Sequence, residues 1–216
     1  MLKIFLIFFL CKISYTLSAQ PGSADSLPIH YNIDSLKKIY GVKKNLLNAF
    51  ELQTLIALSH YPELLNEHIR FTYARIKGTA QTTVTFGSIF KKIDKQYIVF
   101  INDDIKKTGL LLTDASFDAQ VAVLGHELAH VADFKTRSFF DMIWWGLNYL
   151  VVKQRAKIET RTDKSTIRHG LGWPLYFWSD FVLNHSKASD RYKRIRETKY
   201  MKPNEILEYM KKHKLE

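Results

Sequence analysis

One short segment places two histidines and a glutamate at a spacing suited to metal chemistry: His126-Glu127-Leu128-Ala129-His130. Residues four apart on an α-helix lie about 40° apart around the axis and about 6 Å apart along it, so both imidazoles face the same way. Together they can hold one metal ion, and Glu127 on the neighbouring flank can accept a proton from a water that the metal activates. The segment therefore predicts a metal centre with Glu127 as its general base.

A catalytic zinc site takes three protein ligands and leaves one position open. The downstream carboxylates that could supply the third ligand are Asp133, Asp141, Glu159 and Asp163. We favour Glu159, because Glu159 and Asp163 form an ExxxD pair whose carboxylates share one face of a predicted helix. One carboxylate can ligate zinc while the other accepts a hydrogen bond from a ligand histidine. The alternative is a solvated face among basic neighbours.

Taken together, His126-Glu127-x-x-His130 and the later Glu159-x-x-x-Asp163 resemble the gluzincin branch of the zincin metallopeptidases, which includes thermolysin-like enzymes. The resemblance covers roughly residues 97–170. It implies zinc ligands at His126, His130 and Glu159, a general base at Glu127, and a supporting carboxylate at Asp163 that accepts a hydrogen bond from a ligand histidine. It also implies hydrolysis of peptide bonds in a peptide or protein substrate, in a minimal version of the fold.

A metzincin is disfavoured, because Asp133 and Thr136 stand where the extended motif HExxHxxGxxH has glycine and histidine. Candidates for stabilising the oxyanion are His169, Tyr149 and Tyr176, although packing or a helix end would explain each of them equally simply. The segment Tyr97–Ile101 could be a sheet edge that pairs with an extended peptide, or else an ordinary central strand.

The order of hydrophobic patterns predicts helices, then three strands, then helices, which is an α+β domain with a small antiparallel or mixed sheet. The expected strands are 68–76, 81–86 and 97–101. The expected helices are a short one from residue 34, then 46–58, 117–134 capped by Ser116, 139–168 with a break near Gly146 and a stop at Gly170, 173–183, and one from Pro203.

The segment Phe139–Val152 (FFDMIWWGLNYLVV) is strongly apolar and lies between the two ligand segments. Its length suits a buried or interfacial helix and is too short to span a bilayer. We interpret it as a helix packed on the core. The alternative is a membrane-surface or substrate-contact element near the cleft.

Composition limits the class of protein. The chain has 216 residues, of which 46% are hydrophobic, enough for one compact core. It has one cysteine, Cys11, which excludes disulfide scaffolds and thiolate metal clusters. Residues 1–19 have the basic start, short apolar run and small final residues of a secretory signal peptide. The predicted organisation is a signal peptide (1–19), an irregular leader (20–33) and a single zincin-like metallopeptidase domain (34–216).

Export to the periplasm or the exterior follows from that signal, with an uncleaved N-terminal membrane anchor as the alternative. The net charge is +11. We interpret the basic residues of the C-terminal part as a solvated face and expect no nucleic-acid partner, since no nucleic-acid motif accompanies them. These residues are Arg191, Lys193, Arg194, Arg196, Lys211, Lys212 and Lys214. The rival function is a non-catalytic zinc-containing protein of the cell envelope, or one that binds a membrane surface.

Overall fold

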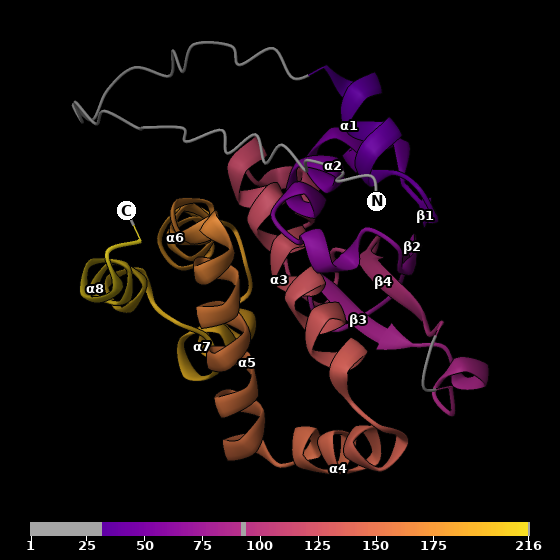
Figure 1. Cartoon of the computed structure of the whole chain (residues 1–216). Coiled ribbons are helices and arrows are strands. Elements are labelled where there is room, and N and C mark those ends of the chain that lie inside the picture. The colour runs from indigo at the N-terminus through magenta and orange to yellow at the C-terminus, as the bar shows by residue number, and fades with distance from the viewer. Residues whose placement is uncertain (1–31, 92–93, 216) are drawn as a thin grey trace, which may run out of the picture. The chain divides into compact units, whose positions relative to one another are not determined.

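The computed structural model describes residues 32–91 and 94–215 (Figure 1). The predicted signal peptide and nearly all of the predicted leader lie outside these residues. The described chain is α+β, as predicted. Its helices are α1 (Ile33–Tyr40), α2 (Glu51–Ser59), α3 (Phe117–Thr136), α4 (Phe139–Leu150), α5 (Val152–Thr166), α6 (Gly172–Asp180), α7 (Asp190–Lys199) and α8 (Pro203–His213).

The sheet of the described residues is mixed and has the order β1-β2-β4-β3. Its strands are β1 (Lys44–Asn45), β2 (His68–Ala74), β3 (Ala80–Val84) and β4 (Gln96–Asn102). β1 and β2 are parallel, as are β2 and β4, whereas β3 runs antiparallel to β4. The three expected strands are thus confirmed to within two residues at each end. β4 is central, so the interpretation of Tyr97–Ile101 as a sheet edge is wrong and β3 takes the edge position.

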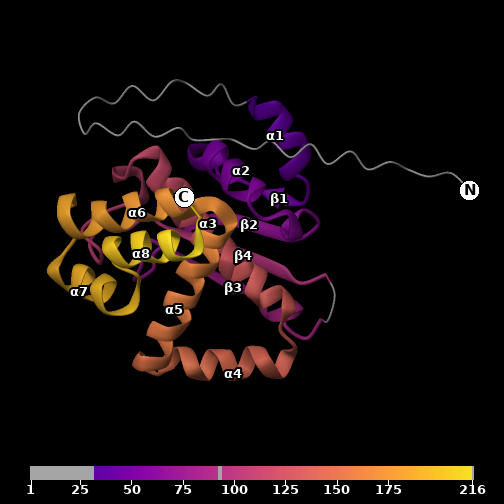
Figure 2. The ribbon, with the colours of Figure 1, turned by 60° about the vertical axis from the view of Figure 1, so that its left-hand side comes forward.

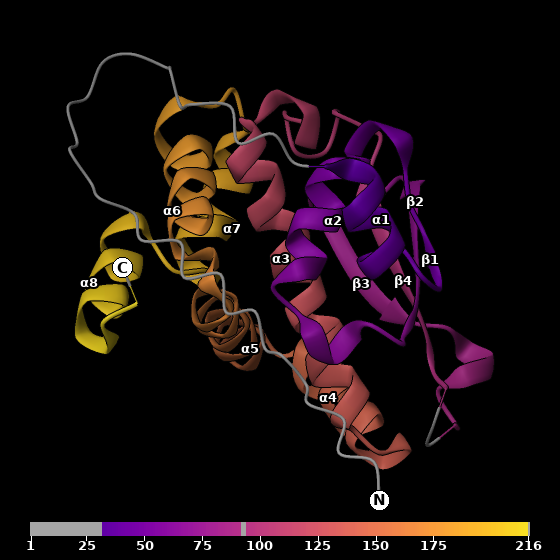
Figure 3. The same cartoon turned by 45° about the horizontal axis from the view of Figure 1, so that its top comes forward.

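Helix α3 lies between the sheet and the C-terminal helices. Figures 1 and 2 show the sheet on one side of α3 and α5, α6, α7 and α8 on the other, while Figure 3 shows α1 and α2 on the sheet side. Ser116 caps α3 as expected, since its hydroxyl accepts the backbone N–H of Ala119 at 3.4 Å. Because layers cover α3 on both sides, every residue from Val121 to Val131 is buried. This helix is a central support of the domain.

The apolar segment after α3 does not continue as one long helix. The predicted helix 139–168 is divided at Val151, whose backbone is extended (φ −85°, ψ 119°), and Gly146 remains inside α4. The break lets α4 cross beyond the end of α3 while α5 returns alongside it (Figure 1). The predicted break at Gly146 is therefore wrong: this glycine lies inside α4, where it costs only a modest amount of helix propensity, and the chain turns at Val151.

Gly170 was expected to end this helix, and the helical backbone is interrupted there. Residues Ile167–Leu171 form a wide turn in which Gly170 has the non-helical values φ +83° and ψ 12°, and a second helix, α6, follows. A positive φ favours glycine, so Gly170 ends the first helix at a kink, as predicted. The expected helix 46–58 starts late: a 3₁₀ turn, Asn48–Phe50, precedes α2.

The outer face of α4 is apolar and exposed. Phe140, Trp144 and Leu150 are 78%, 68% and 80% exposed, whereas Met142 on the opposite face is buried. The interpretation of this helix as simply packed on the core therefore holds for one face only. Among the described helices, none combines the length and hydropathy required to cross a bilayer.

The kink at Gly170 yields a stability prediction. Replacing Gly170 with Ala should lower the free energy of unfolding by about 1–2 kcal/mol, because an alanine side chain disfavours positive φ and its Cβ would lie 3.2 Å from Nδ1 of His60. Gly146→Ala is the matched control, since nothing lies within 4 Å of the added Cβ. That variant should be neutral or stabilising by up to about 1 kcal/mol. Chemical denaturation of both measures the difference, and equal effects would contradict it.

Candidate metal centre

The two histidines and Glu127 lie in the middle of α3, where the helix is buried on all sides. His126, Glu127 and His130 are each only 6–7% exposed. Burying polar side chains costs free energy unless they find partners. The structure therefore has to supply partners for all three, and it does so from α5 and from β3.

Three donor atoms converge between α3 and α5. Nε2 of His126 lies 3.2 Å from Oε2 of Glu159, and Nε2 of His130 lies 3.4 Å from the same oxygen. One donor atom from each residue lies within 4.8 Å of the other two. Atoms that ligate one tetrahedral ion at about 2.0–2.1 Å are about 3.3 Å apart. The buried group of His126, His130 and Glu159 could therefore hold a metal ion.

Glu159 is fixed by its second carboxylate oxygen. Oε1 accepts a hydrogen bond from the hydroxyl of Tyr149 at 2.7 Å and lies 3.6 Å from Nε of Arg155. Oε2 is thereby directed toward the two histidines. A Glu159 carboxylate directed to solvent would exclude this residue as a ligand. Glu159 is only 1% exposed, so its carboxylate is not directed to solvent.

Asp163 positions the His126 ring from one helical turn beyond Glu159. Its Oδ1 lies 2.9 Å from Nδ1 of His126, and its Oδ2 accepts the backbone N–H of Met201 at 2.8 Å. When Nδ1 donates to Asp163, Nε2 keeps a lone pair for a metal. Nδ1 of His130 has no partner within the described part of the chain, and packing against Trp145 (ring centroids 6.2 Å apart) orients that ring instead.

The electrostatics of this group favour positive charge at its centre. Burial alone would lower the pKa of His126, but the hydrogen bonds to Asp163 and Glu159 outweigh burial and raise that pKa to about 10. Burial alone would raise the pKa of Glu159, yet His126 and His130 hold it well below its usual value. A buried cluster that stabilises a cation in this way is suited to a metal ion.

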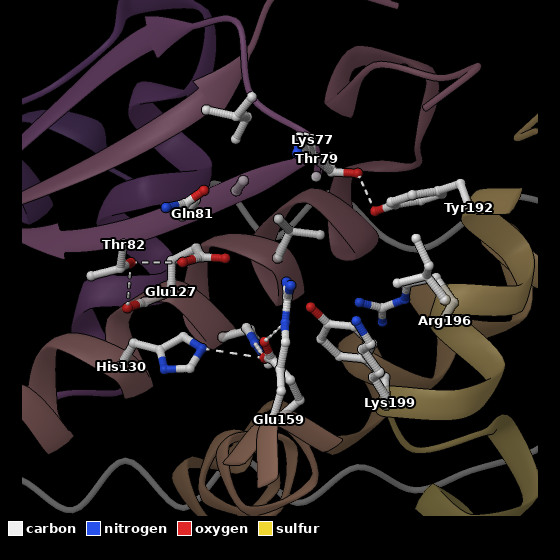
Figure 4. A pocket seen from close by; sticks show the side chains of 18 of the residues that line it. Lys77, Thr79, Gln81, Thr82, Glu127, His130, Glu159, Tyr192, Arg196 and Lys199 are labelled. Atoms are coloured by element: carbon white, nitrogen blue, oxygen red, sulfur yellow. Dashed lines mark hydrogen bonds and ion pairs between the residues drawn. The ribbon is translucent and has the colours of Figure 1, made fainter. Parts of the chain in front are cut away.

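Glu127 faces away from Glu159, toward the sheet. The hydroxyl of Thr82, on β3, lies 2.7 Å from Oε2 of Glu127 and 3.0 Å from its carbonyl oxygen. Figure 4 shows these contacts, with His130 below them and Glu159 below and to the right. The edge strand therefore orients the side chain predicted as the general base.

These residues line a cavity of about 1170 Å³ between β3 and α7. Its floor holds His126, Glu127, His130 and Glu159, and the β2–β3 connection forms one wall. The residues of α7 form the opposite wall (Figure 4). An extended chain of several residues could lie along β3 and reach the floor.

The other predicted residues take different places. Tyr149 lines the cavity, but its hydroxyl donates to Glu159. His169 lies elsewhere: its ring stacks on Tyr61 at 4.2 Å and its Nε2 lies 3.0 Å from Glu63. Tyr176 packs against Trp173 and likewise does not line the cavity. Of the three oxyanion candidates, only Tyr149 is at the site.

The competing carboxylates are engaged in local structure. Asp133 forms two hydrogen bonds with Arg137, and Asp141 accepts the backbone N–H and the hydroxyl of Ser138 at the start of α4. Neither reaches the histidines. Asp163 contacts Nδ1 of His126, so among the four candidates it is Glu159 whose oxygen lies near the Nε2 atoms of both histidines.

Sequence reasoning missed three residues of the cavity. Thr82 gave no signal beyond a β-rich run, because its partner is 45 positions away. Tyr200 was unremarkable, yet its ring lies 5.7 Å from that of His126. Arg196 was assigned to a solvated face, which is wrong: it is 9% exposed and lines the cavity.

Comparison with known proteins adds no assignment. No protein-family model matches the chain, and neither curated proteins nor solved structures give a match.

The converging donors predict stoichiometric metal binding that depends on His130. His130→Ala should lower affinity for a divalent metal more than the roughly 10–100-fold that loss of a supporting partner costs. Dialysis against zinc, cobalt or manganese salts followed by elemental analysis measures it. His169→Ala is the control, because that histidine lies outside the cavity. Equal metal content in both variants would exclude this centre.

Proposed function

We propose that the chain is a zinc-dependent metallopeptidase of the gluzincin type, with an open cavity above a His126, His130 and Glu159 centre. The convergence of these three donor atoms carries the proposal. Two imidazoles and one carboxylate form the ligand set of thermolysin-like catalytic zinc sites, which leave one position open. When bound, zinc would polarise the scissile carbonyl and lower the pKa of a water molecule.

Glu127 has the position required of the proton carrier. Its carboxylate borders the same cavity as the two histidines, and Thr82 restricts its rotation through Oε2. In the proposed reaction it accepts a proton from the attacking water and passes it to the leaving amine. Tyr149 is the candidate that would move from Glu159 toward the developing oxyanion, because its hydroxyl already lies in the cavity.

The edge strand β3 supports the choice of a peptide substrate. β3 pairs with β4 on one side only, and residues 80–83 line the cavity. A strand with one unpaired edge can bind an extended peptide through backbone hydrogen bonds, as in other β-addition complexes. A substrate held there would cross the cavity floor beside Glu127. This role replaces the one considered for Tyr97–Ile101.

The proposed activity predicts the effect of Glu127→Gln. Hydrolysis of a quenched-fluorescence peptide library should fall by about 10²–10⁴-fold, since the amide cannot accept the proton. Metal content and melting temperature should not change, because the amide oxygen still accepts from Thr82. Glu197→Gln, an exposed change on α7, is the matched control.

Two outcomes contradict the peptidase. If Glu127→Gln hydrolyses the peptides as fast as the wild-type chain, the general base is a residue other than Glu127. A wild-type chain that binds one zinc ion and cleaves no peptide of the library would favour the rival function, a non-catalytic zinc-containing protein of the cell envelope.

The exposed face of α4 favours a second candidate function, binding to a membrane surface. Phe140, Ile143, Trp144, Leu147 and Leu150 recur at helical spacing on this face and are all exposed. The aromatic surface continues beyond α4: Phe90 stacks on Phe139 with ring centroids 4.6 Å apart. Apolar helical faces of this kind bind at the headgroup boundary of bilayers.

The charge around this face favours an anionic membrane. Lys91 follows Phe90, and Lys153 and Lys157 are exposed on the helix after α4. The whole chain carries +11. Basic residues beside an apolar face attract anionic lipids, so we infer that this face docks on a bilayer containing them.

Vesicle sedimentation tests this docking. Trp144→Ser and Leu147→Ser should each weaken binding to phosphatidylglycerol-containing vesicles by about tenfold or more, the loss expected when a large apolar side chain is removed from a buried contact. Phe177→Ser, a 43% exposed aromatic on α6, is the control. The wild-type chain could instead form a dimer in lipid-free solution that either α4 variant dissociates. That result would show that a second copy of the chain covers the α4 face, and it would overturn the proposed membrane docking.

A further inference from the structure

The cavity above the metal centre is strongly asymmetric in charge. Its only acidic lining residues among those the structure describes are Glu127 and Glu159, and both belong to the candidate centre. The remaining charged lining residues are basic. Exposed ones stand at the rim: Arg75, Lys77, Lys106, Lys107 and Arg191. Rim charges attract anions at long range, but they do not by themselves form a site.

Deeper in the cavity, α7 contributes two further cations, Arg196 and Lys199. They lie three residues apart and therefore on one face of the helix. Arg196 is 9% exposed, and its guanidinium stacks over the ring of Tyr200 at 3.7 Å. Figure 4 shows Arg196 extending from α7 into the space above Glu159. Arg155 on α5 lies on the same side of the floor, beside Glu159.

Arg196 and Lys199 form no ion pair within 4 Å among the described residues. Other basic side chains of the described chain do form such pairs with carboxylates. A buried guanidinium normally has an anionic or hydrogen-bonding partner, because burial of an unpaired charge is costly. The aromatic ring of Tyr200 covers one face of the guanidinium, and its N–H edge makes no hydrogen bond within the described chain. That edge presents parallel donors to a planar carboxylate.

We propose that Arg196 and Lys199 form a carboxylate-binding subsite, which makes an acidic peptide the preferred ligand of the cavity. A role of this subsite in catalysis rests on the proposed peptidase function, whereas the binding of an acidic peptide does not. A peptide paired along β3 would direct alternate side chains away from the sheet. An acidic side chain, or the terminal carboxylate, of such a peptide would then reach the α7 wall. An oligonucleotide is the less suitable anion, because β3 offers backbone pairing and no stacking platform.

Binding by full-length protein carrying Glu127→Gln tests the subsite without hydrolysis. Three fluorescein-labelled decapeptides serve as probes: one with four Glu residues and an amidated end, its Gln counterpart, and the Gln peptide with a free terminal carboxylate. Anisotropy should show the Glu peptide or the free-carboxylate peptide binding about ten- to hundredfold more tightly than the amidated Gln peptide. Which of the two binds tightly identifies the source of the carboxylate.

Loss of the bidentate guanidinium at Arg196, or of the ammonium charge at Lys199, should weaken that preference selectively. Arg196→Lys and Lys199→Met should each reduce the ratio of acidic to neutral affinity at least about fivefold, and Lys199→Met keeps the test valid where replacement of the stacked arginine impairs folding. Arg194→Met, which removes an exposed charge outside the cavity, is the control. A purely structural role for Arg196 would change both affinities equally and leave their ratio unchanged.

Several outcomes separate this proposal from the peptidase. Acidic preference without hydrolysis by the wild-type chain would retain the subsite and reject the proposed function. Hydrolysis with equal affinity for all three peptides would do the reverse. If Arg194→Met removes the acidic preference as strongly as Lys199→Met does, the preference comes from net charge alone. If a decamer of uridylate binds more tightly than the Glu peptide, the ligand is an oligonucleotide and not a peptide. Either result would overturn the proposed subsite.

Discussion

The approach of α5 to α3 at Glu159 is the contact on which the site depends. A carboxylate that is 1% exposed lies 3.2 and 3.4 Å from two imidazoles that are themselves buried. None of the three groups could be buried alone without a large cost in desolvation, and each reduces that cost for the others. Asp163 then fixes the His126 ring, and Tyr149 fixes the Glu159 carboxylate. The position of α5, and therefore of everything after it, is coupled to the chemistry of α3.

Local pattern was sufficient for the parts of this centre that lie within single helices. His126 and His130 share a face because they are four residues apart, and Glu159 and Asp163 do so for the same reason. Both pairs are where the spacing predicted. Of the four acids, it is Glu159 that joins the two histidines in a group that could hold a metal ion, whereas Asp133 pairs with Arg137 and Asp141 begins a helix.

Contacts between residues far apart in the chain could not be predicted from the sequence. The apolar, β-rich run YIVFI made residues 97–101 a strand, but that run does not show which strands lie beside it, so the choice between edge and centre stayed open. Thr82 became a partner of Glu127 only once β3 was placed beside α3. The break at Val151 was equally hidden, since valine has no special backbone preference for ending a helix and the turn follows from the return of α5.

The least expected feature is the use of α7. Its composition, rich in Lys and Arg, is that of a solvated helix, and half of it is solvated. Arg196 is not: its guanidinium lies 5.7 Å from the ring centroid of Trp178 and 3.7 Å from that of Tyr200, and all three residues line the cavity. Aromatic stacking lets a cation be held below the surface without an acidic partner, because the rings supply attraction without neutralising the charge. The charge therefore remains available to the cavity, which makes a residue that looks like surface a determinant of what enters.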